Sequence, residues 1–100
     1  MLNEEYLQQI AEHNDVHYNV ILLKDGVEVA NYDVISDYDF EVETQNQDFD
    51  EIKVHAIFND SDLGYIYAKS IDSILEQWHK LDTVVNEAVN QEAIYQLSEY

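Results

Sequence analysis

The sequence predicts an α+β fold: a mostly antiparallel sheet of about four to five strands, an N-terminal helix, and one or two C-terminal helices packed on one face. Two observations support this class. Apolar residues recur at helical spacing near both ends of the chain, whereas short runs in the middle alternate apolar with polar residues. The connections between these runs are short, which favours antiparallel strands. The 100 residues contain no Pro, two Gly and no visible linker, so we expect one domain over residues 1–100.

The first expected element is a helix over residues 3–13. Asn3 can cap this helix, and two glutamates occupy its first turn, where the helix dipole favours negative charge. Its apolar stripe consists of Tyr6, Leu7, Ile10 and Ala11.

Residues 16–24 and 27–35 predict a β-hairpin. Both runs are rich in β-forming residues, and the Asp25-Gly26 pair between them is the strongest short-range signal for a tight hairpin turn. The alternation in the second run changes phase after Val29. A β-bulge at that point would explain the change.

Three further strands are expected, over residues 38–44, 52–58 and 63–68. In the first of these, alternation would place the apolar residues on one face and the carboxylates Asp39, Glu41 and Glu43 on the other. Residues 59–62 are polar and predict the turn between the last two strands.

Ser70 predicts the N-cap of a C-terminal helix whose apolar stripe runs from Ile71 to Val89. Asp82 falls within this stripe, while Ile94 and Leu97 fall outside it. The sequence therefore leaves open whether one helix continues or a second helix begins, with Asp82 as its cap.

Negative charge is the dominant compositional feature. The chain has 22 Asp and Glu residues against four Lys and no Arg, which gives a formal net charge of −18. Self-repulsion of this size destabilises the compact state and needs an explanation. An AT-rich genome would favour the many Ile, Asn, Tyr and Asp residues, but it would also favour Lys, which is scarce here. A halophilic host remains an alternative. Nucleic acids and anionic membranes would repel such a protein, so we expect neither as a direct partner.

The sequence predicts no enzyme, no cofactor and no metal site. It contains no Cys, no glycine-rich phosphate loop, no nucleophile elbow and no His-Glu metalloprotease motif. Asp60–Gly64 and Asn46–Asp50 resemble the start of a calcium loop, but Ile71 and Ile57 occupy the position where a bidentate Glu is required. The N-terminal residues lack the basic and apolar regions of a signal peptide, and no apolar run approaches membrane-spanning length, so we expect a cytoplasmic protein.

The most informative local feature is the run of carboxylates at alternate positions from Asp37 to Glu43. On a strand these side chains would stand on one face about 6.6 Å apart. Successive phosphates of one DNA strand are separated by a similar distance, about 6–7 Å. The alternative interpretation is the solvated face of an amphipathic strand. Tyr38 is expected to act as an apolar anchor within this run. The expected partner-binding residues are Asp37, Tyr38, Asp39, Glu41, Glu43, Asp48, Asp50, Glu51, Asp60, Asp62, Asp72 and Glu76.

The whole-chain charge, the short length and the run Tyr38-Asp39-Phe40-Glu41-Val42-Glu43 resemble the acidic DNA-mimic inhibitors made by phages and mobile elements. These include anti-restriction, anti-CRISPR and uracil-DNA glycosylase inhibitor proteins. They share no single fold or motif, so the resemblance is to a class and transfers no individual residue.

The resemblance implies a non-enzymatic inhibitor that occludes a basic nucleic-acid-binding cleft on a nuclease, CRISPR effector or restriction enzyme. Two alternatives stay open at this point. One is an immunity- or antitoxin-like protein that plugs one cognate enzyme, and the other is a general acidic interaction domain. The sequence also leaves open a homodimer, which would extend the charged track by symmetry.

Overall fold

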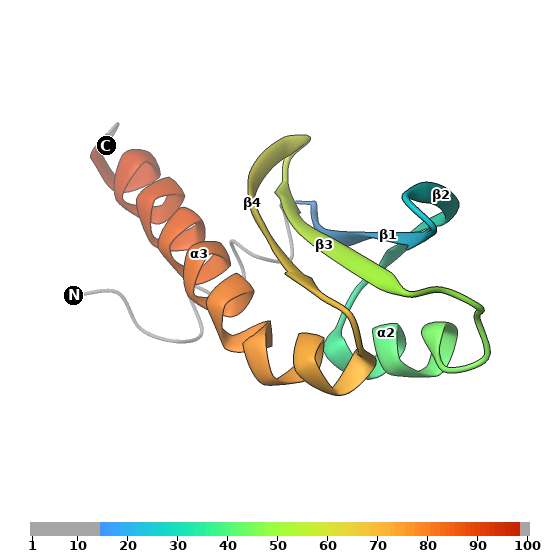
Figure 1. Cartoon of the computed structure of the whole chain (residues 1–100). Coiled ribbons are helices and arrows are strands. Elements are labelled where there is room, and N and C mark those ends of the chain that lie inside the picture. Colours follow the sequence, from blue (N-terminus) through green and yellow to red (C-terminus); the bar gives the residue numbers. More distant parts are fainter. Residues whose placement is uncertain (1–14, 99–100) are drawn as a thin grey trace.

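The computed structural model describes residues 15–98 and contains four strands and two helices within that range (Figure 1). The helix expected over residues 3–13 lies outside the described residues. In chain order the elements are β1 (Val16–Lys24), β2 (Val27–Val34), α2 (Asp37–Thr44), β3 (Glu51–Phe58), β4 (Ser61–Ala68) and α3 (Ile71–Ser98).

The strands form one antiparallel sheet in the order β2-β1-β3-β4, which confirms the predicted α+β class with a C-terminal helix. The β1–β2 hairpin turns at Asp25 and Gly26, whose φ angles of 55° and 78° suit the left-handed residues of a tight hairpin turn. The predicted bulge is present: Leu22 pairs with Ala30 and Leu23 with Glu28, so Val29 is the extra residue of β2.

The core lies between one face of this sheet and the two helices. Alternate residues of β1 and β3, among them Val20, Leu22 and Val54, are fully buried on this face. From the helices, Phe40 of α2 and Trp78 of α3 enter the same core. The Trp78 ring lies 4.9 Å from the Tyr18 ring of β1, measured between centroids, so this indole connects helix and sheet.

Residues 38–44, predicted as a strand, belong to helix α2, and that prediction was wrong. Ser36 is the N-cap, since its side chain accepts a hydrogen bond from the Asp39 amide. Asp37 and Asp39 occupy the first turn, where carboxylates are favourable. Phe40 and Thr44, four residues apart, are the two buried positions. The helical period therefore accounts for what is buried, whereas alternation does not.

Helix α3 continues without interruption from Ile71 to Ser98, so the second helix left open at Asp82 does not form. Asp82 is exposed at the border of the buried stripe, where it accepts a hydrogen bond from the Tyr18 hydroxyl (3.4 Å). Because the Asp82 carboxylate reaches solvent and the Tyr18 hydroxyl from the border of the stripe, the helix can continue past it. Ile94, which falls outside the stripe, is 60% exposed on the same continuous helix.

Candidate acidic binding site

The carboxylates concentrate in a stretch of chain that contains no cation. Between Lys24 and Lys53 the sequence has ten Asp and Glu residues and no Lys or Arg. Seven of them lie between residues 37 and 51, on α2, in the loop that follows it, and at the first residue of β3. We call residues 37–51 the acidic segment. Phe40 lies in the core and Phe49 packs against it, whereas most carboxylates of the segment are exposed.

The helix divides the predicted row of carboxylates into two. Residues four apart share a face of a helix, so Asp37 and Glu41 lie on one flank of α2 and Asp39 and Glu43 on the other. Within each flank the two carboxylates are separated by about one turn, or roughly 5.4 Å of rise. The straight row at strand spacing that the sequence predicted is therefore wrong.

Between the two acidic flanks, opposite the buried Phe40, α2 exposes apolar surface. Tyr38 is 74% exposed and Val42 is 44% exposed. These two residues are also four apart and so are neighbours on the outer side of the helix. We call Tyr38 and Val42 the Tyr38 ridge. Val42 was not among the predicted binding residues, although alternation already placed it on the same face as Tyr38. The helix separates both residues from the buried Phe40.

Helix α2 is held in place by contacts at both of its ends. Beyond the Ser36 cap, the Asp39 carboxylate accepts a hydrogen bond from the Ile35 amide (3.3 Å). At the other end the Thr44 hydroxyl, fully buried, is hydrogen-bonded to the Tyr32 hydroxyl of β2. Burial raises the pKa of the Tyr32 phenol above its ordinary value of 10.0. Asp37 likewise accepts a hydrogen bond from the Tyr38 amide (2.9 Å), so Glu41 and Glu43 present the freer negative charge of α2.

The loop between α2 and β3 is tied to the β1–β2 turn. Asp48 forms an ion pair with Lys24, and the Asp50 carboxylate accepts a hydrogen bond from the Asp25 amide (3.1 Å). The Asp50 amide in turn donates to the Leu23 carbonyl (2.9 Å). At the start of β3, a hydrogen bond involving Glu51 raises the pKa of Tyr67 on β4. These contacts fix the loop, and Lys24 offsets part of its charge.

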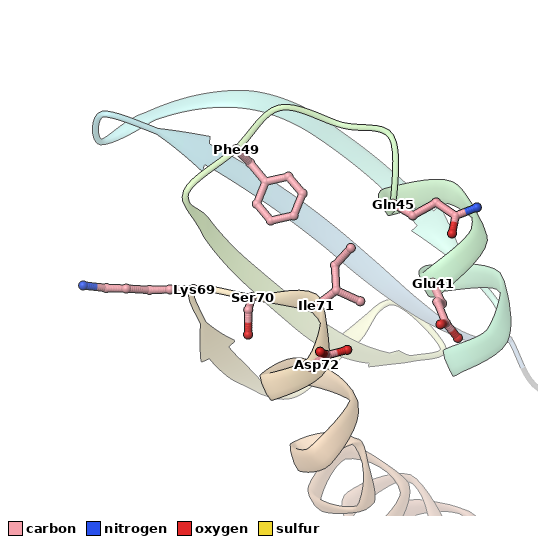
Figure 2. Close-up of a pocket in the computed structure, with 7 residues that line it drawn as sticks. All are labelled: Glu41, Gln45, Phe49, Lys69, Ser70, Ile71 and Asp72. Carbon is pink, nitrogen blue, oxygen red and sulfur yellow. The ribbon is translucent and has the colours of Figure 1, made fainter.

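The beginning of α3 adds two further predicted residues to the same region. Asp72 lies in the first turn of α3 and Glu76 one turn later, both exposed. Asp72 and Glu41 line one hollow between α3 and α2, and Figure 2 shows their carboxylates on the same side of it. The fold therefore brings together carboxylates that are far apart in the sequence.

Asp60 and Asp62, in contrast, do not join this region. They lie at the β3–β4 turn, at the end of the sheet where Phe58 pairs with Val16, whereas the acidic loop joins the end where Glu51 pairs with Leu23. Asp62 also has local partners. The Gly64 amide donates to it (2.9 Å) and holds its pKa below the ordinary value, and His55 is paired with it at 2.8 Å.

The sheet face away from the helices carries a second group of polar residues. His17 and His55 lie in a shallow hollow there, and each is paired with one aspartate, Asp15 or Asp62. The His55 ring also lies 5.1 Å from the Tyr65 ring. Within residues 15–98, no group of three or more His, Asp or Glu side chains is arranged to hold a metal ion.

Comparisons of the chain with protein-family models, with curated proteins and with solved structures found no match. In the part of the chain that the structure describes, neither helix combines the length and the apolar character needed to cross a membrane.

Proposed function

We propose that this protein is a non-enzymatic inhibitor that occupies a basic nucleic-acid-binding cleft of a target protein and presents carboxylates where phosphates would bind. The observation that carries the proposal is the outer surface of α2. There, carboxylates on two flanks frame the exposed Tyr38 ridge, next to the carboxylates of the following loop and of early α3. The proposed targets are nucleases, CRISPR effectors or restriction enzymes, and the proposed place of action is the cytoplasm.

The physics of such binding has two parts. A net charge of −18 steers the protein toward a basic cleft and accelerates association. Carboxylates that become desolvated against arginine guanidinium groups then form charge-assisted, bidentate hydrogen bonds, which slow dissociation. Nucleic acid is excluded because it needs the same cationic groups.

The Tyr38 ridge favours a second candidate, an immunity-like protein that plugs one cognate enzyme. An exposed Tyr beside an exposed Val is typical of the apolar centre of a specific interface, where a few residues supply most of the binding energy. A DNA mimic can inhibit several different targets, provided that they bind nucleic acid of the same shape. An immunity-like protein binds one target, and its affinity depends more on Tyr38 than on charge.

The test begins with capture of partners from host lysate at low salt and elution with rising salt. Each captured protein is then assayed for displacement of labelled DNA or RNA by the wild-type chain. Glu43→Lys on α2 is compared with Glu87→Lys on α3, because both sites are exposed helical positions and both variants change the net charge from −18 to −16.

We expect Glu43→Lys to weaken displacement by about tenfold or more and Glu87→Lys to have a much smaller effect. Equal losses would mean that only the total charge matters, and binding that is indifferent to salt and to Glu43→Lys would reject the proposal. Binding lost in Tyr38→Ala but kept in Glu43→Lys would favour the immunity-like protein.

A further inference from the structure

We infer that the hollow between α2 and the start of α3 receives an arginine side chain of the target. This inference rests on the proposed function and gives it a specific contact. The hollow has a volume of about 470 Å³ and is drawn in Figure 2. It is lined by Glu41, Gln45, Phe49, Lys69, Ser70, Ile71 and Asp72.

The charges of the hollow come from two different elements. Glu41 belongs to α2 and Asp72 to α3, both side chains are exposed, and Figure 2 shows both carboxylates at the same rim. Within residues 15–98 neither carboxylate has a hydrogen-bond or ion-pair partner. Two carboxylates at one rim of the hollow, with the Lys69 ammonium directed away from them, complement a group that has one positive charge and several donors.

The remaining surface of the hollow is apolar. Phe49 and Ile71 are half-buried, and their packing against the core holds their side chains in place. An arginine side chain has a long apolar stem that can cover such a surface, and a planar guanidinium group that stacks on an aromatic ring. The same guanidinium group can donate hydrogen bonds to both carboxylates at once. A lysine ammonium is a point charge and matches this arrangement less well.

The positive groups near the hollow do not favour an anion in its place. Lys69 lines the rim, but Figure 2 shows its ammonium group directed away from the two carboxylates. The N-terminus of α3 carries partial positive charge, which Asp72 in the first turn offsets. Ser70 also accepts a hydrogen bond from the Ser73 amide (3.2 Å), so one free donor of the helix end is already used.

The test uses N-acetyl-arginine methylamide as the probe, with N-acetyl-lysine methylamide and inorganic phosphate as comparison ligands. Amide chemical shifts of the full chain are followed by NMR during each titration. We expect the arginine probe to shift the amides of Phe49, Ser70 and Ile71 most, and the lysine probe to shift them less. Glu41→Gln and Asp72→Asn should each weaken the arginine effect by roughly two- to fivefold, while the matched control Glu87→Gln leaves it unchanged.

Shifts spread evenly over all acidic regions, equal effects of the two cationic probes, or a phosphate response at Ser70 and Ile71 would each overturn the inference. A captured target separates this inference from the proposed function. If Glu43→Lys weakens target binding but Glu41→Gln and Asp72→Asn do not, the function stands and the hollow is not used. If the probe binds the hollow but no basic protein is displaced from nucleic acid, the arginine site stands and the inhibitor proposal fails.

Discussion

The ring of Phe40 lies 5.5 Å from the ring of Trp78, measured between centroids, with the two planes tilted by 36°. This contact joins α2 to α3 and, through the Tyr18 ring, joins both helices to β1. Phe40 is fully buried, while its neighbour Tyr38 is 74% exposed. The same short helix therefore anchors itself in the core with one side and presents the acidic flanks with the other.

Phe40→Ala should destabilise the protein by about 3–5 kcal/mol, because it removes a buried aromatic ring and leaves a cavity against Trp78. Urea unfolding followed by circular dichroism measures the change. Tyr38→Ala is the matched control on the same helix and should change the free energy of unfolding by less than about 0.5 kcal/mol. A similar loss in both variants would contradict the assignment of the buried side of α2.

Ser36→Ala should cost about 1 kcal/mol of stability, because the Asp39 amide loses the hydroxyl that accepts its hydrogen bond (3.1 Å). Because the cap orients α2, the variant should also weaken binding to any partner of the acidic segment. Ser61→Ala, at the exposed start of β4, provides the comparison. If both substitutions are equally neutral in chemical denaturation, the Ser36 cap does not hold α2.

Tyr18 should make the stability of the protein fall at alkaline pH. Burial, and then the nearby Asp82 carboxylate, raise the pKa of Tyr18 to about 12, compared with its ordinary value of 10.0. A raised pKa means that the folded state holds the proton more tightly, so the stabilisation is complete below pH 10 and is lost as the pH rises from 10 to 12.

The measurement for Tyr18 is the difference in free energy of unfolding between the wild type and Tyr18→Phe at several pH values. As the pH rises from 10 to 12, the free energy of unfolding of the wild type should fall relative to that of Tyr18→Phe. A difference that stays constant through pH 12 would show that the Tyr18 phenol does not titrate with a raised pKa.

Added salt should stabilise the folded chain and weaken its binding to a partner. With a net charge of −18, screening reduces self-repulsion, so the thermal midpoint should rise when NaCl is increased from about 10 mM to about 300 mM. Differential scanning calorimetry measures the midpoint. Glu43→Lys should show a smaller rise, because it relieves some repulsion at low salt. A midpoint that falls with NaCl would mean that ion pairs, rather than repulsion, dominate the surface.

Local signals predicted the strands better than they predicted α2. Asp25-Gly26 determines a tight turn through its own backbone preferences, and the phase change after Val29 directly reports the bulge. The α2 residues alternate over a short run that also fits part of a helical period, and their burial depends on Trp78, which lies far along the chain. The sequence did contain one local clue, since Ser36 with Asp39 three residues later is typical of a helix N-terminus.

The candidate site was predicted in composition but not in arrangement. The concentration of carboxylates between Asp37 and Glu51 is visible in the sequence. That Glu41 and Asp72 border one hollow depends on how α2 packs against α3, and no local pattern reports this contact. Asp60 was assigned to the same track because it is acidic, but the β3–β4 turn carries it to the other end of the sheet.

Strand β2 lies at the edge of the sheet and exposes Val27 and Val29, an arrangement that invites another chain to add a strand and begin aggregation. The bulge at Val29 interrupts the regular spacing of its backbone donors and acceptors. In a parallel, in-register pairing of two copies of β2, Glu28 and Asp33 would each lie beside their own counterparts, and the like charges would repel. The bulge and the like charges together make the addition of another β2 strand at this edge unfavourable.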